Sequence, residues 1–209
     1  MHLSTLVTSL LGLSLAASAS PLDKRTSRTS APSGCLTVGS GGQYSTIGAA
    51  LAALGSSAAT ACVYVAAGTY AEQLTITYNG NLTMYGETAD TSSYHDNVVT
   101  ITNTISSSQA GSLDLSATVN VRSNLFRMYN INVVNGYGQG AQAVAYVSYS
   151  SNNWNLSRLT RYNSLVANAD QVGFYGCGFY GYQDTLYSKA GHQYYSNCYI
   201  EGTQPHPPS

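Results

Sequence analysis

The chain has 209 residues, of which 44% are apolar and 8% carry a charge. This apolar content is enough for a buried core, and the length favours one large domain over two small ones. With 8 Lys and Arg against 9 Asp and Glu, the sequence has neither a basic surface of the kind that binds nucleic acid nor an acidic tail. We therefore expect no nucleic acid among its partners.

Residues 1–19 read as a signal peptide. Leu6 to Leu15 form a short apolar run, and Ala17 to Ala19 supply the small residues that signal peptidase accepts. The run is shorter than the roughly 20 apolar residues that span a membrane, and no later segment reaches that length. Residues 20–32 read as a pro-segment or linker, in which Lys24-Arg25 is either a processing site or a pair of solvated charges. We expect a secreted, extracellular protein that does not enter a membrane.

From Ser33 onward the sequence predicts many short β-strands and one helix. The helix spans Thr46 to Leu54, with Ser45 as its N-cap and Gly55 just past its end. The strands are predicted from short alternations of apolar and polar residues, at 62–65, 74–76, 98–101 and 125–128.

An internal repeat indicates how these strands are arranged. FYGCGFYG, residues 174–181, recurs as YSNCYIEG, residues 195–202, and more faintly as MYNINVVN, residues 128–135. The first two copies are 21 residues apart, with Gly or Asn at fixed places. This period suits one coil of a parallel β-helix, in which coils stack about 4.8 Å apart. We predict an all-β, single-stranded parallel β-helix over residues 33–202; a β-sandwich with chance similarity is the alternative.

The four cysteines fit this arrangement. In the 21-residue register Cys177 lies over Cys198, at a separation compatible with the roughly 5.5 Å Cα distance of a disulfide. Cys35 and Cys62 flank the predicted helix, and a bridge between them would tie the helix over the open end of the stack. Secretion permits both bridges, and buried free thiols are the alternative. The sequence has no C-x-x-C and its histidines are scattered, so we expect no metal site and no cofactor.

Four short strings then occur in a specific order. They are GSGGQYSTIGAAL (39–51), GTYAE (68–72), QAVA (142–145) and GYQDTLY (181–187). Together they resemble the pectin methylesterases, secreted right-handed parallel β-helices that act on plant cell-wall pectin, from about Cys35 to Gly202. The resemblance implies hydrolysis of the methyl esters of galacturonate, with methyl-esterified pectin as the partner of a monomeric enzyme.

The resemblance also implies three catalytic residues. Asp184 acts as general acid for the departing methanol and then as base for the water that releases the acyl-enzyme. Gln142 and Gln183 donate amide N–H groups to the oxyanion, and one such donor is typically worth about 3 kcal/mol. The alternatives are a carboxylate that accepts backbone hydrogen bonds at a turn and an amide ladder along the coils.

Further residues are candidates for binding and modification. Tyr137 and Tyr187 are candidates for stacking on sugar rings, and Tyr187 belongs to the fourth string; packing inside the protein is the alternative, because the chain has 18 tyrosines. Asn81 and Asn155 each begin an N-x-Ser/Thr sequon, which permits glycosylation in the secretory route.

The chain departs from the family pattern at the expected nucleophile. In the family an Asp in a DFIFG-like string follows the acid by one coil, and the 21-residue register carries Asp184 to position 205, which is Pro205. The chain reads EGTQPHPPS there, and its prolines cannot donate hydrogen bonds in a buried strand. The segment that brings an Arg to the nucleophile is also missing. We therefore expect the C-terminal coils to be absent, residues 203–209 to be an aberrant tail, and activity to be impaired.

A second departure lies inside the chain. Met128 and Phe174 are 46 residues apart although the coils need about half of that, and the extra residues fall at 146–166. We interpret this insertion and the tail as translated intron sequence or a faulty gene structure; a genuine surface loop and a short isoform are the alternative. Two other functions stay open: a catalytically inactive pectin-binding β-helix, and a calcium-dependent pectate lyase, which needs acidic metal ligands.

Overall fold

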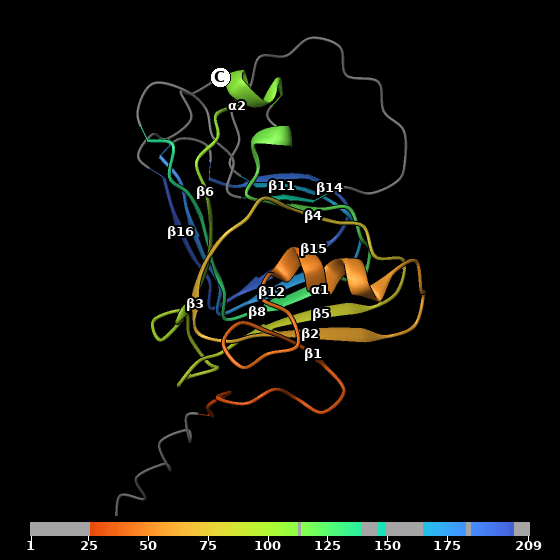
Figure 1. The fold of residues 1–209 in the computed structure, drawn as a ribbon. Helices are drawn as coiled ribbons and strands as arrows, with labels where there is room; N and C mark the ends of the chain where they lie inside the picture. Colours follow the sequence, from red (N-terminus) through yellow and green to blue (C-terminus); the bar gives the residue numbers. More distant parts are fainter. Residues whose placement is uncertain (1–25, 113, 139–145, 149–164, 183–184, 203–209) are drawn as a thin grey trace, which may run out of the picture.

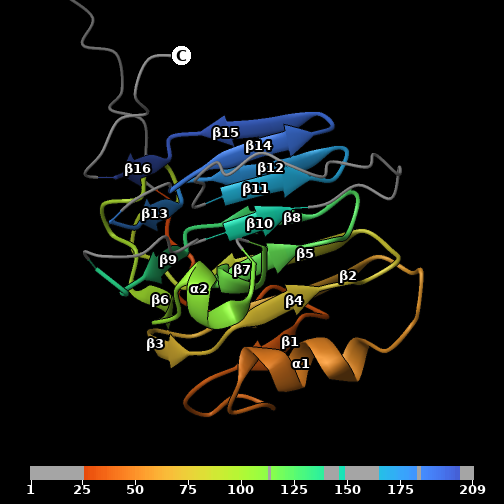
Figure 2. The ribbon, with the colours of Figure 1, turned by 90° about the horizontal axis from the view of Figure 1, so that it is seen from above.

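The computed structural model describes residues 26–112, 114–138, 146–148, 165–182 and 185–202 (Figure 1). Their strands form three sheets in which every pair of named strands is parallel. Figure 2 shows the strands stacked coil upon coil along one axis. The predicted parallel β-helix is confirmed.

Successive coils contribute their strands to three sheets. Sheet 1 contains β1 (Leu36–Val38), β2 (Ala61–Val65), β5 (Leu82–Gly86), β8 (Arg127–Tyr129), β12 (Val172–Tyr175) and β15 (Gln193–Ser196). Sheet 2 contains β3 (Gly68–Ala71), β6 (Val99–Asn103), β9 (Asn132–Asn135), β13 (Gly178–Tyr180) and β16 (Tyr199–Glu201). Sheet 3 contains β4 (Leu74–Ile76), β7 (Val119–Val121), β10 (Tyr146–Ser148), β11 (Leu165–Asn168) and β14 (Tyr187–Ala190).

The core is built from columns of apolar side chains that follow the strand register. Side chains alternate between the two faces of a strand, so equivalent positions in successive coils stack inside the helix. The columns of sheets 1 and 2 are buried at Val63, Met84, Met128 and Phe174, and at Tyr70, Ile101, Val133 and Phe179. Phe174 contacts Phe179 edge to face, with ring centroids 5.5 Å apart.

The 21-residue repeat is confirmed by the strand pairing. Phe174 pairs with Tyr195 between β12 and β15, and Met128 pairs with Phe174 between β8 and β12. The fixed Gly or Asn is the residue that turns the chain from sheet 1 into sheet 2. It adopts a left-handed conformation in three coils, which Gly and Asn tolerate better than other residues: Asn130 (φ 54°), Gly176 (φ 58°) and Asn197 (φ 52°).

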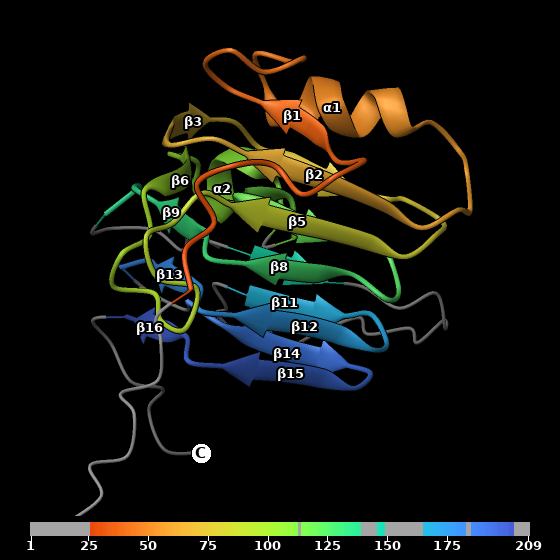
Figure 3. The same cartoon turned by 90° about the horizontal axis from the view of Figure 1, so that it is seen from below.

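Helix α1 (Ile47–Leu54) lies across the end of the stack beside β1, as predicted (Figure 3). Its N-cap is Thr46, whose Oγ1 accepts the Ala49 N–H at 3.2 Å, so the prediction of Ser45 was wrong by one residue. Gly55 follows the helix with φ 61°. The Cys35–Cys62 disulfide is present and attaches β1 to β2, on either side of the helix in sequence.

Two other helical segments were not predicted. Helix α2 (Ser107–Ala110) and a 3₁₀ turn (Asp114–Ser116) are each one turn or less, too short to show an apolar period. The strand predicted at 125–128 begins two residues later, because Leu125 takes a left-handed conformation (φ 59°) that does not fit a strand.

Cys177 does stack on Cys198, but the predicted bridge between them is not formed. Both are free thiols, and the Cys177 backbone N–H donates to Cys198 Sγ at 3.4 Å. The Cys177 S–H instead donates to the Met128 carbonyl oxygen at 3.4 Å. The register prediction is therefore confirmed, whereas the structure contains the pair in its reduced form.

The predicted signal peptide, Lys24-Arg25 and residues 203–209 lie outside the described residues. Residues 26–32, predicted as the end of a linker, contact sheet 1 through Arg28. Its guanidinium lies 4.7 Å from the ring centre of Tyr85 and donates to the Gly86 carbonyl oxygen at 3.0 Å. Within the described residues, no helix is long and apolar enough to cross a membrane.

Candidate active site

The predicted catalytic residues fall on two connections from sheet 2 to sheet 3. Residues 136–145 join β9 to β10 and contain Gln142, while residues 181–186 join β13 to β14 and contain Gln183 and Asp184. Strands β9 and β13 are neighbours in sheet 2, with Val134 paired to Tyr180 at their ends. The two connections therefore begin side by side.

Gln142, Gln183 and Asp184 lie outside the described residues, as do Asn155 and Pro205. The backbone of Tyr187 opens β14 and pairs with Val166. The catalytic roles of Gln142, Gln183 and Asp184 therefore stay predictions.

The connection that carries Gln183 and Asp184 is fixed at both ends to the next coil. The Gly181 N–H donates to the Glu201 carbonyl oxygen at 3.2 Å, and Thr185 Oγ1 donates to the same oxygen at 2.5 Å. Thr185 is 5% exposed, and Leu186 packs against the core. These hydrogen bonds attach Gly181 and Thr185, described residues on either side of the Gln183-Asp184 pair, to the next coil.

The other connection begins with a similar anchor. The Tyr137 backbone N–H donates to Asn135 Oδ1 at 3.2 Å. Asn135 is buried, and its Nδ2 donates to the carbonyl oxygens of Ile105 and Ser116 at 3.2 and 3.0 Å. Tyr137 itself is half-buried at the start of the connection, which is compatible with its predicted place beside a substrate.

Sequence reasoning missed Thr185, Glu201 and Asn135 as positioning residues. Thr185 lies within the GYQDTLY string, so its position was visible, but its bond to Glu201 depends on the stacking of two coils. Asn135 gave a weaker signal, as one of many Asn residues in a chain rich in them.

Between the coil of β8 and β9 and the coil of β12 and β13, sheet 3 contains an additional strand that sheets 1 and 2 lack. Strands β8 and β12 pair directly in sheet 1, and β9 and β13 pair directly in sheet 2, but β11 lies between β10 and β14 in sheet 3. Adjacent strands are about 4.8 Å apart. The two connections therefore start on neighbouring strands and end two strands apart, on the two sides of β11.

The described residues offer little metal chemistry. Among the parts of the chain that the structure describes, no three or more His, Cys, Asp or Glu side chains gather where they could hold a metal ion.

The chain is similar to known proteins of one family. The pectinesterase family profile matches residues 36–205. A probable pectinesterase A from Neosartorya fischeri is 66% identical over 202 residues, 97% of this chain and 56% of that protein. A pectinesterase A from Emericella nidulans is 63% identical over 179 residues, 86% of this chain and 49% of that protein.

A solved structure of a pectin methylesterase has a similar fold. The pectin methylesterase from Aspergillus niger, in a form that retains an N-acetylglucosamine stub, superposes with a TM-score of 0.75. It is 70% identical, and the match covers 85% of this chain and 53% of that one. The chain thus spans about half the length of the relatives it matches.

Proposed function

Because this chain belongs to the pectinesterase family, we propose that its fold serves the hydrolysis of methyl esters of galacturonate in pectin, with release of methanol. The family match over residues 36–205 carries this proposal. The pairing of β9 with β13 supports it, because the segments that contain Gln142 and Gln183-Asp184 follow these two neighbouring strands in the sequence.

In the proposed reaction Asp184 protonates the departing methanol and then takes a proton from the water that hydrolyses the acyl-enzyme. Gln142 and Gln183 donate N–H groups to the oxyanion of the tetrahedral intermediate. Neutral donors stabilise that charge without engaging the carboxylates, each by about 3 kcal/mol. Tyr137 and Tyr187 are proposed to stack on sugar rings of methyl-esterified pectin, and no cofactor takes part.

We further propose that this chain is impaired. The register position of the nucleophile is Pro205, which has no carboxylate. Strand β11 supports the same conclusion, since it separates the ends of the two catalytic connections by one additional strand, or about 4.8 Å. Loss of one member of a catalytic group usually removes most of its rate.

The coil that contains β15 and β16 exposes large apolar side chains. Ile200 of β16 continues the interior column of Phe179 but is 44% exposed, and Tyr194 and Tyr199 are 59% and 37% exposed. Exposed apolar side chains favour association between chains. We propose that the chain as printed is prone to aggregation.

Methanol release from methyl-esterified pectin tests the proposal on three chains. The first is the chain as printed. The second, called the repaired chain, lacks residues 146–166 and has residues 203–209 replaced by the C-terminal half of the Neosartorya fischeri relative. The third is the repaired chain with Asp184→Asn. We expect activity only in the repaired chain, with a loss of at least about 100-fold on Asp184→Asn.

Two results would overturn parts of the proposal. An inactive but folded repaired chain would refute the esterase function. Equal activity of the printed and repaired chains would refute the impairment. Retention of the printed chain on immobilised methyl-esterified pectin without methanol release would favour the second candidate function, an inactive pectin-binding β-helix; this candidate rests on the same family match and the missing carboxylate at Pro205.

We also propose that the protein is secreted, through the signal peptide at residues 1–19, and acts as a monomer. Asn81 lies immediately before β5 and is half-buried. Its sequon and the N-acetylglucosamine on the Aspergillus niger structure support a glycan at Asn81. Treatment of the secreted protein with a glycosidase should reduce its mass, and Asn81→Gln should make that reduction smaller by the mass of one glycan.

A further inference from the structure

The outer face of sheet 1 contains a hollow that the proposed reaction does not use. Arg127 of β8, Gly173 of β12 and Tyr194 of β15 occupy one register across three neighbouring strands. Gly173 has no side chain to fill the space between the other two. A cavity of about 370 Å³ opens there, and its walls include Arg127, Gln171, Gly173, Tyr175, His192 and Tyr194.

The floor of the hollow is aromatic. The Tyr175 ring lies over Gly173 so closely that a Cβ on Gly173 would come within 2.7 Å of it. Tyr175 also stacks on Tyr129, with ring centroids 4.6 Å apart and planes 10° apart, and its centroid is 5.7 Å from that of Tyr194. Gly173 is therefore required for the ring to lie flat on the sheet.

The hollow is the uncovered half of a longer row of tyrosines. Tyr85 stacks on Tyr129 at 5.2 Å, and the Arg28 guanidinium lies over both rings, at 4.7 and 5.7 Å from their centres. Beyond Tyr129 the row continues through Tyr175 to Tyr194, whose side chain is 59% exposed. One half of the row is thus occupied by a side chain of the protein itself, and the other half is open to a ligand.

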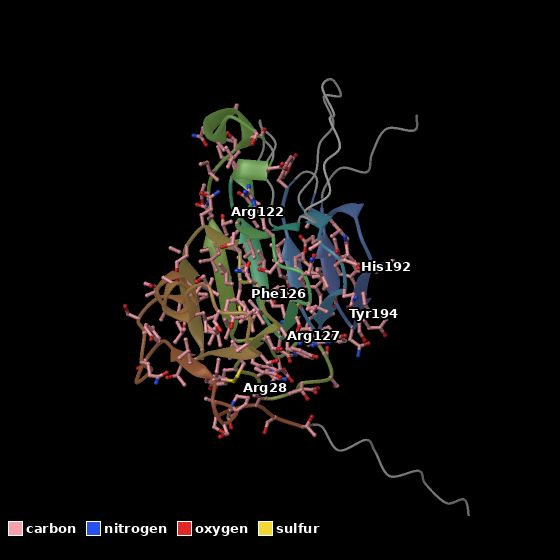
Figure 4. All side chains as sticks on the ribbon, turned by 90° about the vertical axis from the view of Figure 1, so that its right-hand side faces the viewer. Arg28, Arg122, Phe126, Arg127, His192 and Tyr194 are labelled. Atoms are coloured by element: carbon pink, nitrogen blue, oxygen red, sulfur yellow. A yellow bond between two sulfur atoms is a disulfide. The ribbon has the colours of Figure 1, made fainter. Side chains whose placement is uncertain are left out.

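The rim of the hollow carries cationic and hydrogen-bonding groups. Figure 4 shows Arg127, His192 and Tyr194 together on one side of the molecule. Asp170 accepts the His192 backbone N–H at 3.0 Å and lies 2.7 Å from His192 Nδ1, so its charge is engaged by that residue. Among the described residues Arg127 forms no ion pair with a carboxylate, and its guanidinium is exposed.

The tyrosine rings and the Arg127 guanidinium together indicate which class of ligand would bind. The flat faces of tyrosine rings suit the apolar faces of sugar rings, and the guanidinium fork of Arg binds a carboxylate through two parallel hydrogen bonds. The volume lies at the lower end of the range for small-molecule sites, which fits one or two sugar rings. We propose that this hollow is a non-catalytic subsite for an acidic sugar, namely a de-esterified galacturonate unit of pectin.

The choice of galacturonate among acidic sugars rests on the proposed function. The position of the subsite is independent of the proposed function, because the hollow is on sheet 1. The catalytic connections instead join sheet 2 to sheet 3. A pectin chain that binds Arg127 does so through a free carboxylate, so its galacturonate unit at this site is already de-esterified. The subsite would keep the protein on partly de-esterified pectin without competing for methyl esters.

Calorimetry of the full chain with de-esterified oligogalacturonate tests the proposal. Arg127→Gln should weaken binding at least tenfold through loss of the carboxylate contact, and Tyr194→Ala should weaken it similarly through loss of stacking. Tyr194→Phe keeps the ring and should retain binding. Arg122→Gln serves as the matched control, because Arg122 is also exposed but lies away from the hollow (Figure 4).

The same titration tests whether the site depends on the charge of the ligand. A neutral galactan oligomer should bind more weakly and show no effect of Arg127→Gln. Absence of binding to the folded chain, or binding that is insensitive to both Arg127→Gln and Tyr194→Ala, would overturn the subsite. Neither result would affect methanol release by the repaired chain, so the two proposals fail independently.

Discussion

The Glu72 carboxylate accepts the backbone N–H of Ile47 at 2.8 Å, which joins the connection before β4 to the first turn of α1. Its second oxygen accepts the N–H of Gly48, also at 2.8 Å. Two of the backbone donors that every helix N-terminus leaves unpaired are thereby satisfied by a residue 25 positions away in sequence. The helix that covers the end of the stack is thus fixed by a charged cap.

Glu72→Gln should destabilise the protein by about 1–2 kcal/mol. The amide can accept only through its single oxygen, and it lacks the charge that favours the positive end of the helix. Urea unfolding, followed by circular dichroism, measures the change. A destabilisation of less than about 0.3 kcal/mol would show that the cap contributes nothing beyond what solvent provides.

Thr46 and Ser45 provide a matched pair for the N-cap. Thr46→Ala removes the side-chain oxygen that accepts the Ala49 N–H and should cost about 1 kcal/mol. Ser45 is exposed and precedes the cap, so Ser45→Ala should change the free energy of unfolding by less than about 0.5 kcal/mol. The reverse order of the two effects would restore the sequence-based assignment of Ser45.

Phe174 is expected to be the most sensitive core position near the repeat. It is fully buried and its ring contacts those of Phe126, Phe179 and Tyr195. Phe174→Ala should cost about 3–5 kcal/mol, because it removes apolar burial and leaves a cavity. Phe174→Leu fills most of that space and should cost markedly less; equal costs for both would contradict the cavity explanation.

Cys177 and Cys198 are predicted to form a disulfide on oxidation. Burial raises the pKa of the Cys177 thiol, whereas the hydrogen bond from Cys177 lowers the pKa of the Cys198 thiol. Cys198 should therefore attack oxidised glutathione first, and Cys177 should then displace glutathione from the mixed disulfide. Mass spectrometry should find the chain lighter by two hydrogens.

Substitutions identify the cysteines involved. Cys177→Ser should stop the reaction at the glutathione adduct on Cys198, while the Cys35–Cys62 bridge stays intact in both cases. An unmodified pair of thiols after prolonged oxidation of the folded protein would contradict the prediction and leave the reduced pair as the native form.

Asp170 should make the stability depend on pH in the acid range. The His192 backbone N–H, followed by its side chain, lowers the pKa of the Asp170 carboxyl in the folded protein. A lowered folded pKa means that the stabilisation is present above the unfolded pKa of about 3.9 and is lost as pH falls through the folded value. Unfolding of the parent and of Asp170→Asn should differ at neutral pH and converge at low pH; a constant difference would contradict this.

Much of the fold could be predicted because it depends on local patterns and on the repeat. The pairing of Phe174 with Tyr195 follows from the 21-residue period, and α1 follows from its apolar run and Gly55. The disulfide of Cys35 with Cys62 followed from their places on either side of that helix.

The rest depends on contacts that no short string contains. Thr46 replaces Ser45 as the cap because the entry of the chain into the helix decides which hydroxyl reaches Ala49. The hollow lies between Arg127 and Tyr194, over Gly173. These three residues belong to three different coils, so the hollow exists only after the coils have stacked. Strand β11 was likewise not predicted, although the additional residues around it were.

We propose that residues 146–166 and 203–209 interrupt a coil of a pectinesterase. Reverse transcription and sequencing of the message from the living organism test it most directly. The account predicts a transcript in which the codons for 146–166 are absent and the reading frame continues past Gly202 into an Asp-containing coil. A message that encodes both segments as printed, with its stop codon after Ser209, would contradict it.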